Sequence, residues 1–270
     1  MLLERNRMRH VVITGSARGI GYEIAREFLR LGLCVTVSSV NADSLANAKE
    51  RLVEYGDRVQ FVRCDVRNRD EVKALWQVAE QHWGGVDVWI NNAGISQPRQ
   101  KLWELSGDTT EAIVCTNILG VIYGSQIAAE GMIRQGHGFI YNMEGLGSDG
   151  RIVDKTGLYG MTKWNLVYFT KALARELRGT PVRVGRLLPG MMPTDFITKP
   201  TLGEQSRVVD EQTRKIFNIL GDKPDTVARY LAARILSNRS ANSHIKWLTA
   251  GRVMGRFLLA PFRKRNIFDQ

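Results

Sequence analysis

Tyr159 and Lys163, four positions apart in YGMTK, are the residues of this chain whose types and spacing most directly suggest chemistry. Four residues make about one helical turn, so on a helix the phenol and the ammonium lie on the same face. A lysine beside a phenol favours the phenolate, which makes the tyrosine a usable proton donor and acceptor near neutral pH. Both residue types are common on protein surfaces, so the meaning of the pair depends on the elements that position it.

A glycine-rich turn, TGSARGIG (14–21), lies between a β-branched stretch at 10–15 and an amphipathic stretch at 22–32. Gly15 permits a tight turn, while Gly19 and Gly21 let the backbone approach a pyrophosphate at a helix N-terminus. Because a strand and a helix are expected on either side, the pattern predicts dinucleotide binding rather than a turn without a ligand. The residues expected at the nucleotide are Gly15, Ser16, Arg18, Gly19, Ile20 and Gly21.

The type of nucleotide is suggested by the end of the second apolar stretch, 33–39. An NAD site carries an acid at this point for the ribose hydroxyl, but here the position is Ser39. No carboxylate would repel a 2′-phosphate, and Arg18 could pair with it. The sequence therefore favours NADPH, with NADH as the alternative. Asp65 and Val66 follow a third apolar stretch, where the aspartate is placed either to meet the adenine or to cap the next helix.

The remaining sequence alternates short apolar stretches with amphipathic ones. This alternation predicts right-handed crossovers and an α/β fold, a single doubly wound (Rossmann) parallel sheet with helices on both faces. The cleft is expected at the carboxyl ends of the strands. We expect one domain over 1–270, with a basic amphipathic extension at about 250–270. The strands are expected in 10–15, 33–39, 58–66, 86–94, 138–143 and 182–190, and two long helices at 108–134 and 157–178.

Composition narrows the function classes. The chain has 270 residues and a formal charge of +11, which permits anionic partners without selecting one. We expect no nucleic-acid partner, because no nucleic-acid-binding module is recognisable. The four histidines lack metal-ligand spacing, and three widely separated cysteines suit buried reduced thiols. No run approaches 18 apolar residues, so no membrane-spanning helix is expected, and the N-terminus lacks an apolar core of signal-peptide length.

Taken together, the motifs resemble the short-chain dehydrogenase/reductase family. They occur in the family's order over about 200 residues. The resemblance implies hydride transfer between a nicotinamide and a carbonyl or alcohol. The matching segments are TGSARGIG (14–21), Asp65-Val66, NNAG (91–94), Asn117, YGMTK (159–163) and PGMMPTD (189–195).

The resemblance also implies residue roles. Tyr159 would donate the proton, and Lys163 would hold the nicotinamide ribose and lower the tyrosine pKa. Asn117 resembles the residue that holds a helix irregularity and a water feeding protons to the lysine. The remaining residues implied at the cofactor are Asn92, Ala93 and Gly94 on the adenosine ribose side, and Pro189, Gly190 and Thr194 at the carboxamide.

One departure from the family pattern concerns carbonyl polarisation. Most members carry a serine pair where this chain has Glu144-Gly145, and a glycine has no hydroxyl to offer. Polarisation could come from Tyr159 alone, from the backbone N–H of Gly145 or Leu146, or from Ser148. Ser148 is the side-chain candidate, and its alternative role is a hydrogen bond within the loop.

The same loop indicates a subgroup. NMEGLGSDGR followed by YGMTK is similar to the chlorophyll b reductase branch, and the tail shares that branch's apparent lack of the family's closing strand and glycine pair. The resemblance implies NADPH-dependent reduction of the C7 formyl group of chlorophyll b to 7-hydroxymethyl chlorophyll a. Two alternatives stay open: a short-chain reductase for another lipophilic aldehyde or ketone, and a nucleotide-binding scaffold with little turnover. The intact Tyr159, Lys163 and Asn117 argue against the scaffold.

The tail and the partners complete the expectations. Arg252 and Arg256 are one helical turn apart with apolar residues largely opposite, Pro261 should end the helix, and a basic run fills 263–265. Such a segment could lie on an anionic membrane surface as a peripheral contact. It could equally pack its apolar face on the body or a second subunit, with the arginines solvated. The resemblance implies a homo-dimer or homo-tetramer through the two long helices. We expect a cytoplasmic location, or the plastid stroma or thylakoid surface in a phototrophic eukaryote.

Overall fold

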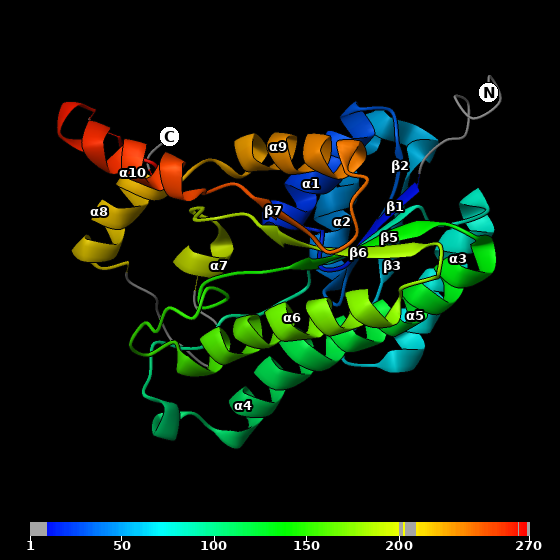
Figure 1. Cartoon of the computed structure of the whole chain (residues 1–270), viewed down its shortest axis with the longest axis horizontal. Helices are drawn as coiled ribbons and strands as arrows, with labels where there is room; N and C mark the ends of the chain where they lie inside the picture. The colour runs from blue at the N-terminus through cyan, green and yellow to red at the C-terminus, as the bar shows by residue number, and fades with distance from the viewer. Residues whose placement is uncertain (1–9, 200–201, 203–208, 264, 269–270) are drawn as a thin grey trace.

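Seven parallel strands form one sheet in the order β3-β2-β1-β4-β5-β6-β7 (Figure 1). The structure, a computed structural model, describes residues 10–199, 202, 209–263 and 265–268. The strand order runs in opposite directions on the two sides of β1, so the prediction of a doubly wound parallel sheet is confirmed. The strands are β1 (His10–Ile13), β2 (Cys34–Ser39), β3 (Val59–Arg63), β4 (Val88–Asn91), β5 (Gly138–Met143), β6 (Val182–Leu188) and β7 (Ser243–Lys246).

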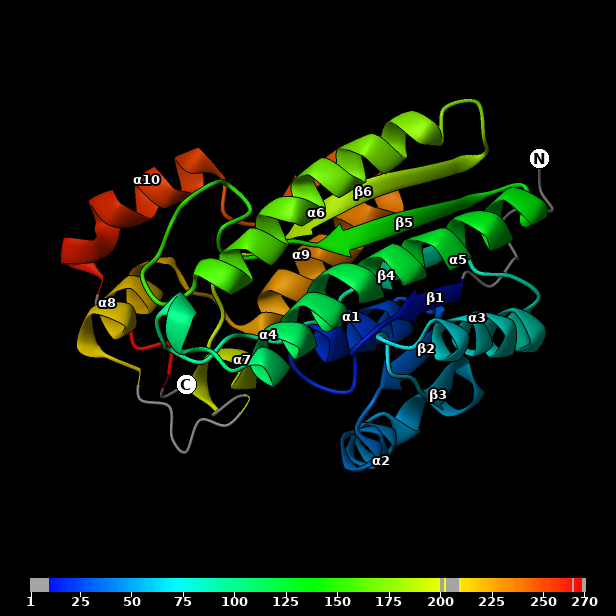
Figure 2. The ribbon, with the colours of Figure 1, turned by 90° about the horizontal axis from the view of Figure 1, so that it is seen from below.

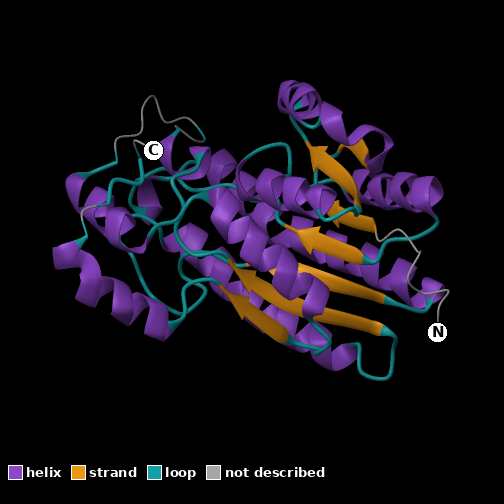
Figure 3. Cartoon of the chain, turned by 90° about the horizontal axis from the view of Figure 1, so that it is seen from above, coloured by secondary structure: helices purple, strands orange, loops and turns teal. Residues whose placement is uncertain are grey.

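Helices cover both faces of the sheet, as Figure 3 shows. Side chains alternate along β1: Val11 and Ile13 pack in the core under one helical layer, and Val12 packs in the core under the other. One layer holds α1 (Gly19–Arg30), α2 (Ala42–Arg51) and α9 (Pro224–Ser237), and the other holds α3 (Arg69–Trp83), α5 (Gly120–Gln135) and α6 (Gly157–Glu176). Short 3-10 turns occupy Val53–Arg58, Leu102–Glu104 and Ala260–Phe262.

Local signals set several helix ends. Asn41 caps α2 by accepting a hydrogen bond from the Ser44 N–H at 2.7 Å. Gly84 ends α3 in the left-handed conformation, at φ 74°. These residues fix where α2 begins and where α3 ends.

The long helix expected at 108–134 is interrupted. It consists of α4 (Gly107–Val114), a π turn at Cys115–Leu119 and α5, and Figure 2 shows it beside α6. The stretch 107–135 is long and apolar enough to fit a membrane span, but half of that apolar window is buried inside the protein. The same composition is therefore accounted for by its packing as a core helix.

The carboxyl ends of the strands all face the same side of the molecule (Figure 3). The loop after β4, the loop at 144–156 after β5 and the segment after β6 all leave the sheet there. The last of these leads into α7 (Asp195–Thr198) and α8 (Glu211–Leu220). This edge is where ligands bind in doubly wound sheets.

The expectation that the tail lacks a closing strand is wrong. Ser243–Lys246 forms β7, which pairs in parallel with β6 and sets Ile245 opposite Leu187. The strand has four residues, of which only Ile245 is both apolar and buried. So short a stretch with one buried side chain gives no alternating hydrophobic pattern to recognise.

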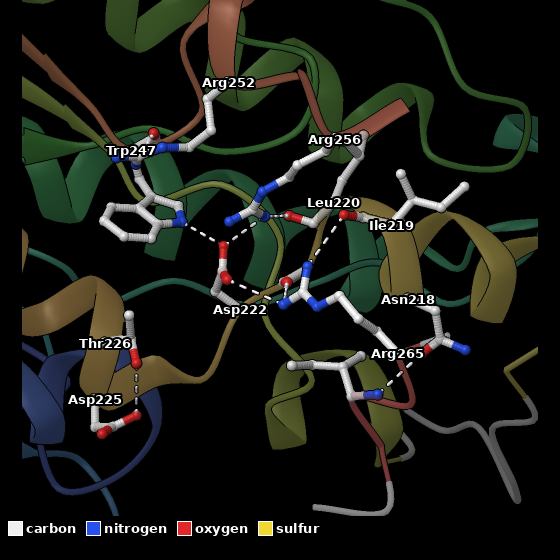
Figure 4. Close-up of polar contacts among 12 residues, drawn as sticks. Asn218, Ile219, Leu220, Asp222, Asp225, Thr226, Trp247, Arg252, Arg256 and Arg265 are labelled. Atoms are coloured by element: carbon white, nitrogen blue, oxygen red, sulfur yellow. Dashed lines mark hydrogen bonds and ion pairs between the residues drawn. The ribbon is translucent and has the colours of Figure 1, made fainter. Parts of the chain in front are cut away.

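The tail helix α10 (Ala250–Leu259) has the predicted basic and apolar faces. The basic face packs on the body of the protein, and the apolar face lies outside. Arg252 lies over the Trp247 ring, 3.9 Å from its centroid, and Arg256 donates to the Leu220 carbonyl at 2.7 Å (Figure 4). The apolar face is left outside, with Leu258 69% exposed. The expectation of solvated or membrane-bound arginines is therefore wrong for Arg252 and Arg256. Lys264, part of the predicted basic run, lies outside the described residues.

The buried carboxylate of Asp222 explains this orientation. It accepts hydrogen bonds from Trp247 Nε1 at 2.6 Å and Arg265 Nη2 at 3.2 Å, and it forms an ion pair with Arg256 Nη1 at 2.6 Å. A buried charge is costly unless it is paired, so the two guanidinium groups turn toward it. The apolar side chains of α10 consequently face away from the body.

Asp222→Asn should destabilise the fold by about 2–3 kcal/mol, since two partly buried guanidinium groups lose their counter-charge. Thermal unfolding of the purified protein should show this as a lower melting temperature. Asp225→Asn is the matched control, because Asp225 pairs with Arg229 across an exposed helix surface at 3.0 Å. Exposed pairs are worth about 1 kcal/mol or less. Equal melting temperatures for the two variants would contradict the anchoring role.

Candidate active site

The glycine turn is locked against the loop after β4. A Cβ on Gly15 would lie 2.7 Å from the Ala93 Cα, and Gly15 has φ +61°, so the turn requires glycine here. The Thr14 hydroxyl oxygen accepts from the backbone N–H groups of Asn92 and Ala93, at 3.0 Å each. The Asn92 side chain donates back to the Thr14 and Gly15 carbonyls at 2.9 Å. These hydrogen bonds hold the glycine turn after β1 against the loop after β4, although the two segments are nearly 80 residues apart in the sequence.

The start of α1 fits a phosphate-bearing nucleotide. Gly19 opens the helix at φ +60°, and a Cβ built on it would meet no atom within 4 Å. The backbone there is open to a pyrophosphate on the helix N-terminus. Arg18 precedes it with an exposed side chain, while Ile20 is partly buried against the core. The Ser16 hydroxyl is buried and donates to the Ile13 carbonyl at 2.6 Å, so it holds the turn rather than facing the cleft.

The residues expected at the ribose and adenine lie along the neighbouring strand ends. Ser39 ends β2, and its hydroxyl accepts from the Asn41 N–H at 3.2 Å. The Asp65 carboxylate accepts from Arg67 Nη2 at 2.6 Å, and the cap of α3 is Asn68. Asp65 is therefore not the helix cap that the sequence left open as its alternative role. Val66, which follows it, is buried.

Tyr159 and Lys163 lie together at the start of α6, and both are buried. The Lys163 ammonium donates to the Met143 carbonyl at 3.1 Å and lies 5.8 Å from the centroid of the tyrosine ring. Burial raises the pKa of Tyr159 above its ordinary value and lowers the pKa of Lys163 to about 8. Burial is thus the cause of the raised tyrosine pKa, and the lowering of this pKa by Lys163 stays a prediction.

Asn117 lies in the π turn and is fully buried. Its side chain accepts from the Ile95 N–H at 2.8 Å, and it donates to the Ile95 carbonyl at 2.9 Å and to the Thr162 hydroxyl at 3.2 Å. A Cβ on Gly94 would lie 3.3 Å from Asn117 Oδ1 and 3.6 Å from Lys163 Nζ. The helix irregularity implied by the family resemblance is present, and it brings the loop after β4 to the lysine.

Gly145 lies directly against the tyrosine hydroxyl. A Cβ built on Gly145 would be 2.5 Å from Tyr159 Oη and 3.4 Å from Lys163 Cε. A serine here would therefore require the tyrosine ring to move. Ser148 is buried in the following turn, where its backbone N–H donates to the Gly145 carbonyl at 3.1 Å. No hydrogen bond joins its hydroxyl to Tyr159 within the described residues, so its catalytic role stays a prediction.

The segment after β6 packs beside the Tyr159 ring. Pro189 is buried at the strand end, and Gly190 turns the chain at φ +80°. Thr194 precedes α7, and the Phe196 ring in α7 lies 5.6 Å from the Tyr159 ring between centroids. Met192 packs in the core. Phe196 is thus the apolar side chain of this segment that contacts the catalytic tyrosine candidate.

Sequence reasoning missed two side chains that hold the site. Gln97 Oε1 accepts from the Tyr159 backbone N–H at 2.9 Å, although the residues are 62 positions apart. Glu144, noticed only as a missing serine, has a buried carboxylate held by Arg186 and His244 at 2.9 Å each. Gln97 is distant from Tyr159 in the sequence, and the two partners of Glu144 are distant from it as well. No local motif could therefore have indicated these contacts. A glutamate next to an expected catalytic position was the one available signal.

The geometry defines an oxidoreductase that uses a nicotinamide dinucleotide: an open helix N-terminus for a pyrophosphate, beside a buried tyrosine and lysine. A model of the short chain dehydrogenase family matches residues 9–204, so the chain belongs to that family.

Curated relatives extend the match beyond this region. The chain is 36% identical over 275 residues to chlorophyll(ide) b reductase NOL, chloroplastic, of Oryza sativa subsp. japonica, covering 96% of this chain and 78% of that protein. It is 32% identical to the Arabidopsis thaliana protein of the same name, covering 97% and 77%. Against the rice probable chlorophyll(ide) b reductase NYC1, chloroplastic, it is also 32% identical, but the chain spans only 54% of that protein's length. The subgroup resemblance is confirmed.

Solved structures agree with the fold and the cofactor class. A short chain dehydrogenase/reductase from Burkholderia phymatum in complex with NAD superposes with a TM-score of 0.78 at 25% identity, covering 96% of each chain. A serine dehydrogenase complexed with NADP+ gives 0.76 at 26% identity, covering 90% of this chain and 95% of the other. Both nicotinamide nucleotides occur among the neighbours, so the chain is an NAD(P)H-dependent oxidoreductase.

Gly145→Ser should lower kcat by about 100-fold, because the new side chain displaces the tyrosine hydroxyl from its position. Nucleotide affinity, measured by fluorescence titration, should stay nearly unchanged. Gly157→Ser is the matched control, since a Cβ there would meet no atom within 4 Å. A gain in carbonyl reduction by Gly145→Ser would instead mean that the site accepts a catalytic serine.

Proposed function

We propose that this enzyme reduces the C7 formyl group of chlorophyll b to a hydroxymethyl group with NADPH. The observation that supports this proposal most is the extent of the match to chlorophyll(ide) b reductases, which covers 96–97% of this chain. The 3beta-hydroxysteroid dehydrogenase 2 of Eggerthella lenta, 34% identical, covers only 68% of the chain. The Glu144-Gly145 pair, in place of serines, supports the same assignment.

The residues of the site can perform the proton chemistry of this reaction. A bound nicotinamide supplies the hydride. Tyr159 is protonated at neutral pH because burial raises its pKa, so it can give a proton to the developing alkoxide. Lys163 holds the ribose as an ammonium below pH about 8. The backbone N–H groups of Gly145 and Leu146 donate no hydrogen bond within the described residues, which leaves them able to polarise a carbonyl.

Exposed apolar side chains at the carboxyl end of the sheet suit a large apolar substrate. Ile152 is 92% exposed and Trp103 80% exposed, and both lie on loops that leave this edge. The two loops are joined by Lys101 and Asp154 at 2.9 Å. Clusters of exposed apolar residues mark binding surfaces more often than free surface. The alternative is a reductase for another lipophilic aldehyde or ketone, which the same rim would accept.

NADPH is the proposed cofactor, with NADH the alternative. Ser39 offers no carboxylate to repel a 2′-phosphate. Arg18 is 67% exposed, and its nearest carboxylate partner, Asp195, is 3.7 Å away. So loose an ion pair leaves the guanidinium able to turn to a phosphate.

A homo-dimer or homo-tetramer and a plastid location are also proposals. Met161, Trp164 and Tyr168 form an exposed apolar row on α6, the helix implied at the subunit contact. The chlorophyll(ide) b reductases matched above are chloroplastic proteins. By similarity, we propose the plastid stroma or the thylakoid surface as its location, with the cytoplasm as the alternative.

Purified protein incubated with NADPH and chlorophyll b should form the 7-hydroxymethyl pigment. The product is separated by chromatography and measured by its absorbance. Tyr159→Phe should abolish product while changing the NADPH Kd by less than about twofold, since only the proton donor is lost. Parallel assays with NADH should give about tenfold lower kcat/KM. NADPH oxidation with simple aldehydes but never with the pigment would favour the alternative substrate class. NADPH binding without turnover across a carbonyl panel would favour the scaffold.

We also propose that the outward apolar face of α10, rather than its arginines, meets an anionic lipid bilayer. The side chains of Met254, Leu258 and Phe262 are 63–84% exposed. The stretch 243–268 contains no acidic residue, which suits an anionic surface, and its basic residues are Lys246, Arg252, Arg256, Arg263, Lys264 and Arg265.

Vesicle flotation tests this contact. The full-length chain should float with vesicles containing anionic lipid, and Met254→Ser/Leu258→Ser should lose most of the bound fraction because apolar burial drives the insertion. Val53→Ser, which removes an exposed apolar side chain from the turn after α2, is the control. Equal flotation of all three proteins would reject the contact.

A further inference from the structure

The carboxylate of Glu144, the residue between β5 and Gly145, is held by side chains from the two neighbouring strands, β6 and β7. It is 3% exposed, and its two oxygens contact Arg186 Nη1 on β6 and His244 Nε2 on β7, at 2.9 Å each. Burial by itself would raise the pKa of Glu144, but the hydrogen bonds and charges of His244 and Arg186 outweigh it and lower this pKa. The group is therefore a buried negative charge at neutral pH.

Stability alone explains this cluster poorly. Buried ion pairs often contribute no more to folding than apolar residues of the same size. Arg186 carries a further cost, because its Nε is buried without a hydrogen-bond partner within the described residues. A costly charge pair at the carboxyl end of the sheet points to a role in the adjacent site.

The cluster is directly connected to the residues of the site. The Glu144 backbone N–H donates to the Leu187 carbonyl at 2.8 Å, which pins the end of β5 to β6. The preceding residue, Met143, offers the carbonyl that receives the Lys163 ammonium at 3.1 Å. The following residue, Gly145, lies against the tyrosine hydroxyl. Glu144 thus lies between Met143, whose carbonyl accepts from the lysine, and Gly145, which lies against the tyrosine hydroxyl.

Among the residues that the structure describes, few charged groups act on Lys163. Glu144 at the end of β5 acts on it with a negative charge, and Tyr159 on its own helix is the neighbouring titratable group. The π turn and the loop after β4 contribute the uncharged Asn117 and Gly94. Burial lowers the pKa of the lysine, and the charge of Glu144 raises it. Arg186 and His244 face the carboxylate from its other sides.

We propose that Glu144 is a positioning residue for carbonyl reduction, which keeps the Lys163 ammonium charged and the Gly145 backbone seated against Tyr159. Arg186 and His244 hold the carboxylate in place for this task. The proposal rests on the proposed roles of Tyr159 and Lys163, but it does not depend on which carbonyl compound is the substrate.

The charge of the lysine gives a measurable signature in the pH profile. The ammonium is present below the lysine pKa and is lost as pH rises through it, so kcat/KM should fall on the alkaline side near pH 8. Tyr159 does not interfere, because burial raises its pKa above 10.0. Removing the negative charge of Glu144 lowers the lysine pKa further, so the alkaline limb should move to lower pH.

Glu144→Gln should shift this limb down by about one pH unit, as expected for the loss of a nearby unit charge. Activity should consequently fall more at pH 8 than at pH 6.5. Glu144→Asp, which keeps the charge, should restore the limb to within about 0.3 units of its original position. Asp149→Asn is the control, since it removes an exposed carboxylate in the same loop that pairs with Arg151 at 2.7 Å. Its limb should not move.

A uniform loss of kcat at every pH, with the limb unmoved, would overturn the proposal and leave Glu144 a purely structural role. If Glu144→Gln does not fold, Glu144→Gln/Arg186→Gln removes both buried charges together and should shift the limb in the same direction by a smaller amount, because the opposing positive charge of Arg186 is lost as well. An unmoved limb in the double variant also overturns the proposal. The proposed role of Tyr159 as proton donor is tested separately. Near-normal turnover by Tyr159→Phe would reject that role, whatever the pH profile of Glu144→Gln shows.

Discussion

Burial of the Lys163 ammonium is the constraint on which the active end of this protein depends. A cation removed from water needs an acceptor and a counter-charge. The Met143 carbonyl and the Glu144 carboxylate supply them. The carboxylate is then itself a buried charge, and its pairing recruits Arg186 from β6 and His244 from β7. One desolvated amine thereby organises the ends of three strands.

The same principle explains the tail. Asp222 draws in Arg256 and Arg265, so α10 packs by its charged face rather than by its apolar one. An amphipathic pattern states which residues share a face of a helix, but it does not state which face packs. Charge pairing with a residue outside the helix made that choice here.

Much of the fold and the nucleotide side of the site follows from the sequence, because those features are local. The glycine turn and the Tyr159–Lys163 spacing each depend on residues within a few positions of one another. The features that were missed depend on distant pairs. The two partners of Glu144 are 42 and 100 residues away in the chain. In β7, a single buried apolar residue gave no periodic signal, and only the pairing with β6 reveals the strand.

The pairing of Glu144 with His244 has a consequence for the order in which the protein matures. Tyr159, Lys163, the glycine turn and the loop after β4 all precede β7 in the sequence, so they are synthesised before it. Until then the Glu144 carboxylate lacks one of its two partners, and the edge of β6 is open. A nascent chain could therefore carry every residue of the family signature in its folded part and still lack the electrostatic setting of its lysine. The charge environment of the active site is therefore complete only once β7 has paired with β6.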